Sequence, residues 1–158
     1  MPNFLKLRPF DDDGNLNMVV ETPRGSTVTV SRSLVLGQTY PFDWGFIPGT
    51  KAEDGDPLDS LAVHDSSTYP GVVLPCRALG VVDVSQKGEK GREENPRLIV
   101  MPSWHERMGE CEKATGLPKR LREEIEQFFV SATFFTGKLG DRDKGVARHR
   151  GISSSGAW

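Results

Sequence analysis

Cysteine is scarce in this chain. Its 158 residues include only Cys76 and Cys111, which form no Cys-x-x-Cys pair and no spacing typical of zinc ligands. This excludes a small disulfide-stapled scaffold and a structural zinc module. Two free thiols in a reducing compartment are the expectation, and a disulfide between the two residues is the alternative.

Long apolar runs are also lacking. No stretch approaches the ~18 apolar residues that a membrane helix needs. The first residues, Met-Pro-Asn-Phe-Leu-Lys, are followed by three aspartates at positions 11–13 and not by the apolar segment of a secretory signal. We therefore expect a cytoplasmic protein without a membrane partner.

The chain has no strong excess of charge of either sign. Its 20 basic and 22 acidic residues give a formal net charge of −2. A nucleic-acid binder would usually carry a concentrated basic surface, so we expect no nucleic-acid partner. The length suits one domain, and a domain of this size hides roughly 68–70% of its unfolded surface without staples.

Short β-type runs fill the first two thirds of the sequence. We expect strands over residues 16–21, 26–30, 61–63, 72–74, 79–84 and 98–101. The polar stretch from Gln86 to Arg97 predicts an exposed hairpin loop. Several short strands at this spacing favour a closed barrel or a sandwich over a parallel sheet.

The pattern becomes helical after Pro102. Leu121, Ile125, Phe128 and Phe129 fall on one helical face, which predicts a helix over residues 118–130. A second, weaker helix is expected over residues 104–115. The fold class is therefore α+β and strand-rich, with one or two helices packed on a barrel.

We expect two parts in the chain: a barrel domain over residues 1–136 and a basic tail over residues 137–158. From Lys138 to Arg150 the tail holds five basic residues against two acidic ones. A loose, solvated terminus is the preferred interpretation. Contact with phosphate or nucleic acid is the alternative.

Three carboxylates stand within six residues. The segment Asp-Gly-Asp-Pro-Leu-Asp carries Asp54, Asp56 and Asp59, and Glu53 precedes it. Crowded carboxylates repel one another, and a divalent cation relieves that repulsion. Oxygen ligands suit Mg²⁺, Ca²⁺ or Mn²⁺ and not zinc. A solvated acidic turn explains the hexapeptide alone equally well.

Two other acidic motifs fit poorly. An EF-hand loop counted from Asp54 needs an oxygen ligand at its fifth position and glycine at its sixth, where this chain has Leu58 and Asp59. An aspartyl-phosphate enzyme of the haloacid dehalogenase type would place its Asp-x-Asp after a buried strand, but residues 49–53 are polar.

The residues before the acidic cluster decide between a metal site and a plain turn. Tyr-Pro-Phe-Asp-Trp-Gly-Phe-Ile-Pro-Gly-Thr at positions 40–50 leads directly into it. Val-Glu-Thr-Pro-Arg-Gly-Ser stands upstream at 20–26, and Pro-Gly-Val-Val and Cys-Arg-Ala-Leu-Gly-Val follow at 70–73 and 76–81. In this order the segments resemble the soluble, family I inorganic pyrophosphatases over about residues 4–131.

The resemblance implies a five-stranded barrel of the oligonucleotide-binding type with a packed helix, Mg²⁺-dependent hydrolysis of pyrophosphate and a homo-oligomer. By the same resemblance Asp54, Asp59 and Asp56 hold the metals, and Asp56 also orients the attacking water as general base. Glu21 supports a metal. The implied contacts to pyrophosphate come from Arg32, Tyr40 and Arg97.

Four features depart from the family pattern. The stretch from Glu21 to Arg32 is about a dozen residues shorter and lacks a hairpin with a phosphate-binding lysine. Gln86 and Asn95 stand where two further metal-binding aspartates are expected. Ala132-Thr133 replaces a tyrosine and a polar or basic residue, and Trp44 replaces a smaller aromatic residue.

Two hypotheses follow. The first is an active Mg²⁺-dependent inorganic pyrophosphatase, which the run from Tyr40 to Asp59 favours. The second is a catalytically impaired relative that binds metal or phosphate or serves as a structural or interaction subunit, which the departures favour. A nucleic-acid role of the barrel ranks third, because no alternation of exposed aromatic and basic residues is evident.

Overall fold

The structure is a computed structural model that describes residues 3–30, 33–88, 91–94, 96–105, 111–134 and 149–153. Within these residues, two short 3-10 turns, η1 (Phe4–Lys6) and η3 (Ala114–Gly116), accompany one α-helix, α1 (Lys119–Phe134). The strands are β1 (Leu16–Thr22), β2 (Thr27–Val30), β3 (Ser33–Thr39), β4 (Asp43–Ile47), β5 (Leu58–Ala62), β6 (Val73–Gly88), β7 (Gly91–Glu94), β8 (Arg97–Pro102) and β9 (His149–Ser153).

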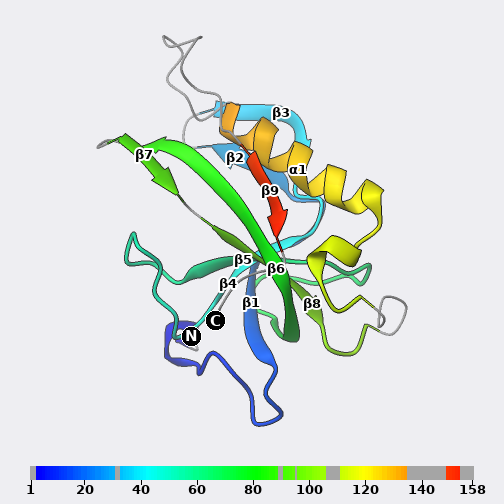
Figure 1. Cartoon of the computed structure of the whole chain (residues 1–158). Helices are drawn as coiled ribbons and strands as arrows, with labels where there is room; N and C mark the ends of the chain where they lie inside the picture. Colours follow the sequence, from blue (N-terminus) through cyan, green and yellow to red (C-terminus); the bar gives the residue numbers. More distant parts are fainter. Residues whose placement is uncertain are drawn as a thin grey trace.

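Five of these strands close into a barrel. They follow one another in the order β1-β4-β5-β8-β6, and pairing of β6 with β1 closes the ring. The β5–β8 pair is parallel, and the other four pairs are antiparallel. Helix α1 crosses one side of the barrel, and the β2–β3 hairpin lies beyond it (Figure 1). The expected strand-rich α+β barrel with a packed helix is therefore confirmed.

The β6 strand differs from its prediction. Two separate strands were expected over residues 72–74 and 79–84, but β6 runs unbroken from Val73 to Gly88. Its register against β8 shifts between Ala78 and Gly80, which is an irregularity that bends a strand without ending it. The expected polar hairpin exists, and it is built of paired strands, β6 and β7, that project from the barrel (Figure 1). Strands β3 and β4 were not expected.

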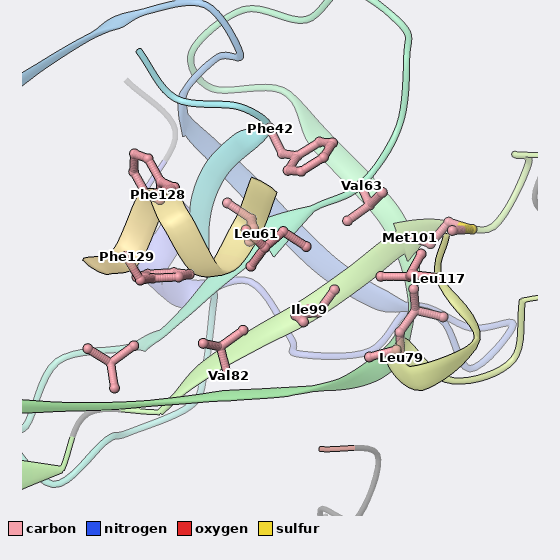
Figure 2. Close-up of a cluster of buried hydrophobic side chains, with 13 residues drawn as sticks. Phe42, Leu61, Val63, Leu79, Val82, Ile99, Met101, Leu117, Phe128 and Phe129 are labelled. Carbon is pink, nitrogen blue, oxygen red and sulfur yellow. The ribbon is translucent and has the colours of Figure 1, made fainter. Parts of the chain in front are cut away.

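The barrel strands are covered on both faces. One cluster of buried side chains comes from all five barrel strands and fills the interior; its members are Met18, Val20, Ile47, Ala62, Leu74, Cys76, Leu98 and Val100. The other lies between the barrel and α1, where Leu61 and Ile99 face Phe128 and Phe129 (Figure 2). Burial on two faces explains why residues 98–101 form a continuous apolar run.

Two further predictions concern the last third of the chain. The expected weak helix over residues 104–115 is wrong for the described part, where only the turn η3 is helical; residues 106–110 lie outside the described part. The tail is not loose throughout, because His149–Ser153 forms β9 and pairs with β6. Backbone pairing with a strand edge needs no apolar sequence, so composition could not show it. The division at residue 136 stays a prediction.

Cys76 and Cys111 are both free thiols, as expected. Cys76 is fully buried inside the barrel, and burial raises the pKa of its thiol far above the usual range. It therefore acts as a small apolar side chain.

Candidate active site

The loop of residues 48–57 between β4 and β5, here called the acidic loop, is held at both ends by the side chain of Thr50. The Thr50 hydroxyl donates to the carbonyl oxygen of Ile47 at the end of β4 and accepts from the amide of Leu58 at the start of β5 (2.9 Å). Inside the loop, Gly55 has φ +92°, a conformation that favours glycine. The Asp56 amide donates to a carboxylate oxygen of Asp54 (3.1 Å). The loop thus presents exposed carboxylates on a defined turn.

Glu21 reaches the same region through an irregularity in β1. The register between β1 and β4 shifts between Val20 and Thr22, so Glu21 sits in a bulge. Bulges re-aim side chains and are frequent beside active sites. Partial desolvation, and then the neighbouring charge of Asp59, raise the pKa of Glu21. The bulge therefore brings a carboxylate from β1 toward one from β5.

Asp59 lies at the junction of the loop and the barrel. Its carboxylate is 3.1 Å from a terminal guanidinium nitrogen of Arg97, which stands beside it on the parallel strand β8. Burial raises the pKa of Asp59, Arg97 opposes that shift, and the charges of Asp54 and Asp56 add to it. The three aspartates of the cluster therefore share one electrostatic environment.

Tyr40 lies beside these carboxylates and belongs to a group of four packed aromatic rings, here called the aromatic ledge: Tyr40, Trp44, Phe128 and Phe129. Its ring centroid lies 6.0 Å from that of Trp44 and 5.3 Å from that of Phe128. Desolvation, followed by the charges of Glu21 and Asp59, raises the pKa of the Tyr40 hydroxyl. At neutral pH this hydroxyl is protonated and can donate a hydrogen bond to an anion.

The structure thus brings six of the seven expected site residues into one region: Glu21, Tyr40, Asp54, Asp56, Asp59 and Arg97. Arg32 lies outside the described residues. Carboxylates face a guanidinium and a tyrosine hydroxyl, a combination suited to binding cations and phosphate oxygens together.

The family model for inorganic pyrophosphatase matches residues 14–147. The chain belongs to this family. It is similar to the inorganic pyrophosphatase of Thermus thermophilus, with 33% identity over 136 residues that cover 79% of this chain and 75% of the relative. The corresponding values for the Synechocystis inorganic pyrophosphatase are 30% over 129 residues, 75% and 74%.

Solved structures agree with the family. The crystal structure of the Thermus thermophilus inorganic pyrophosphatase matches with a TM-score of 0.78 at 29% identity and covers 97% of this chain and 90% of its own. The structure of the Neisseria gonorrhoeae enzyme matches with a TM-score of 0.73 at 26% identity, covering 96% and 90%. The five-stranded barrel and its helix are thus those of inorganic pyrophosphatases.

The chemistry of this pyrophosphatase-family site fits a magnesium ion. Asp54, Asp56 and Asp59 offer hard oxygen ligands, and their mutual repulsion at Asp59 is what a cation would relieve. Among the residues that the structure describes, no three His, Cys, Asp or Glu side chains converge as a ready cage. Mg²⁺ does not require one, because it keeps several waters and uses one or two carboxylates.

Sequence reasoning missed a buried polar network around Asp43, the first residue of β4. One Asp43 carboxylate oxygen accepts from Thr68 (2.6 Å) and lies 2.7 Å from Nε2 of His64, and the other accepts from the Arg24 amide (2.8 Å). The available signal was a charged residue, Asp43, among the apolar residues before Trp44. A charge there needs buried partners.

One finding bears on membrane association. Within the described part of the chain, no helix combines the length and the apolar character that crossing a membrane requires.

Proposed function

We propose that this chain hydrolyses inorganic pyrophosphate to two phosphates. The observation that carries the proposal is that Asp59 pairs with Arg97 and lies within electrostatic reach of Glu21, on a barrel that belongs to the inorganic pyrophosphatase family. Hydrolysis needs water placed in line with a phosphorus atom and positive charge around the phosphate oxygens. The loop and the strands beside it offer side chains for both tasks.

The proposed residue roles follow from chemistry and position. Asp54, Asp59 and Glu21 hold magnesium, and Asp56 accepts the proton of the attacking water. When bound, magnesium neutralises phosphate oxygens and lowers the pKa of a bound water. Arg97 and the Tyr40 hydroxyl bind phosphate oxygens, and Arg97 stabilises the leaving phosphate. The family resemblance gives Arg32 a similar contact.

The decisive experiment measures phosphate release from pyrophosphate with and without Mg²⁺. The wild type is compared with Asp56→Asn and with Asp13→Asn, which makes the same chemical change in the turn before β1, at the other end of that strand from Glu21. We expect Mg²⁺-dependent release by the wild type and Asp13→Asn, and a loss of at least a hundredfold in Asp56→Asn, since one transition-state contact contributes about 10²–10³.

The alternative is a relative that binds metal or phosphate, or acts as a structural subunit, with impaired catalysis. Gln86 and Asn95 stand where the family pattern has metal-binding aspartates. Wild-type turnover no greater than that of Asp56→Asn, together with pyrophosphate binding by calorimetry, would favour this alternative. A cytoplasmic location, a homo-oligomer and the absence of a nucleic-acid or membrane partner remain predictions.

A further inference from the structure

Arg97 forms an ion pair with Asp59, a carboxylate that the proposed function assigns to a metal. Its guanidinium lies 3.1 Å from an Asp59 oxygen, and the side chains are only 13% and 32% exposed. Pairing of neighbouring positions on β5 and β8, Ser60 with Leu98, sets these two residues side by side. The contact is thus built into the barrel and does not depend on a mobile surface rotamer.

The Arg97 guanidinium also contacts the ring of Trp44. The Arg97 Cζ atom lies 5.5 Å from the centroid of the Trp44 ring, within the range of a cation–π interaction. Trp44 is itself braced by Tyr40 and Phe129, each with a ring centroid 6.0 Å away. A guanidinium that leaves Asp59 therefore still has a fixed aromatic face to stack on.

The charge of Arg97 acts on the acidic loop as a bound cation would. Burial lowers the pKa of the guanidinium, and Asp59 and Asp54 oppose this shift. Arginine stays protonated at neutral pH. The Asp59 carboxylate, which is proposed to hold magnesium, is therefore already partly neutralised by the side chain of Arg97.

We propose that Arg97 is a built-in counter-ion that competes with magnesium for Asp59 and, once released, remains stacked on Trp44 to bind pyrophosphate. The inference rests on the proposed function of the acidic loop. Metal and substrate then assist each other: an anion that draws Arg97 away frees Asp59, and a metal at Asp59 frees Arg97. By linkage, each ligand tightens the other by the same factor.

The test is calorimetric titration of Mg²⁺ into the wild type, Arg97→Gln and Arg97→Met, with and without inorganic phosphate. Arg97→Met keeps an apolar chain against Trp44, which guards against a folding defect in Arg97→Gln. Arg8→Gln is the control, because Arg8 forms an exposed pair with Asp12. Circular dichroism is used to check that each variant is folded.

Without phosphate, we expect both Arg97 variants to bind Mg²⁺ about tenfold more tightly than the wild type and Arg8→Gln, within the usual range of coupling. Phosphate should tighten Mg²⁺ binding to the wild type and leave the Arg97 variants nearly unchanged. If both folded Arg97 variants bind Mg²⁺ as tightly as the wild type or more weakly, this inference is overturned and the proposed function is not affected. Absence of Mg²⁺ binding in all four proteins would overturn the proposed metal site as well.

Discussion

The Asp43 carboxylate lies 2.7 Å from Nε2 of His64, and both side chains are almost completely buried. The Ser66 amide donates to Nδ1 of the same ring (3.2 Å), so the Nε2–H points to Asp43. Together with Thr68 and Arg24, this network joins the start of β4 to the β1–β2 turn and to the loop after β5. It therefore fixes the backbone of β4 at the residue that precedes Trp44.

The Asp43 network makes stability depend on pH in the acid range. Burial alone would raise the pKa of Asp43, but hydrogen bonds from His64, Thr68 and Arg24 outweigh it and hold this pKa below its ordinary value of 3.8. A carboxylate with a lowered folded-state pKa stabilises the fold above its unfolded-state pKa, and this stability is lost as the pH falls through the folded-state pKa.

We therefore expect Asp43→Asn to lower the free energy of unfolding at pH 7 by about 1–3 kcal/mol, as for a buried group left poorly paired. The difference from wild type should shrink below pH 4. Urea unfolding between pH 7 and pH 2.5 measures both effects. The exposed Asp12→Asn should change little. A difference that stays constant down to pH 2.5 would contradict the pKa assignment.

We expect the Tyr40 hydroxyl to contribute to substrate binding and little to stability. In Tyr40→Phe the ring contacts with Trp44 and Phe128 remain, so the melting temperature should change little. The loss of a hydrogen bond to a charged oxygen should lower kcat/KM for pyrophosphate about 10- to 100-fold. Tyr69→Phe, at a residue that is 70% exposed, is the control. Unchanged kcat/KM in Tyr40→Phe would remove this residue from the binding site.

Local patterns predicted the elements whose neighbours lie close in sequence or whose two faces are buried. The strand around residues 98–101 and the helix carrying Ile125 were recognised because their apolar periodicity reflects burial directly. The site residues were proposed through a family resemblance over about residues 4–131, whose most specific stretch is positions 40–59. Physical reasoning on the acidic hexapeptide alone left a solvated turn as likely as a metal site.

Relationships set by non-local pairing could not be predicted. The Arg97–Asp59 contact depends on the parallel pairing of β5 with β8, and nothing in either segment specifies that partner. The continuity of β6 past Gly80 depends on β8 in the same way. The tail strand β9 is stabilised by backbone pairing, which leaves little trace in side-chain composition.

Gly45 allows β1 and β4 to approach closely. A Cβ atom on Gly45 would lie 1.9 Å from the carbonyl oxygen of Val19, which is backbone and has no room to yield. We expect Gly45→Ala to destabilise the fold by about 3 kcal/mol, at the upper end of the costs of overpacking. Thermal unfolding measures the effect. Gly116→Ala is the matched control, since its Cβ meets only the Cys111 sulfur, at 3.6 Å. Equal melting temperatures for the two variants would contradict this explanation.

Ile125 anchors α1 on the barrel. Its side chain is completely buried in the cluster that includes Leu61 and Ile99. Ile125→Ala should lower the free energy of unfolding by about 2–5 kcal/mol, because it removes buried methyl groups and leaves a cavity. Gln127→Ala, on the exposed side of the same helix, should cost less than about 0.5 kcal/mol.

Because Phe128 and Phe129 of this helix pack on Tyr40 and Trp44, Ile125→Ala should also raise KM for pyrophosphate. Denaturant unfolding and steady-state kinetics on the same preparations separate the two effects. A stability loss with unchanged KM would show that the aromatic ledge holds its position without the helix anchor.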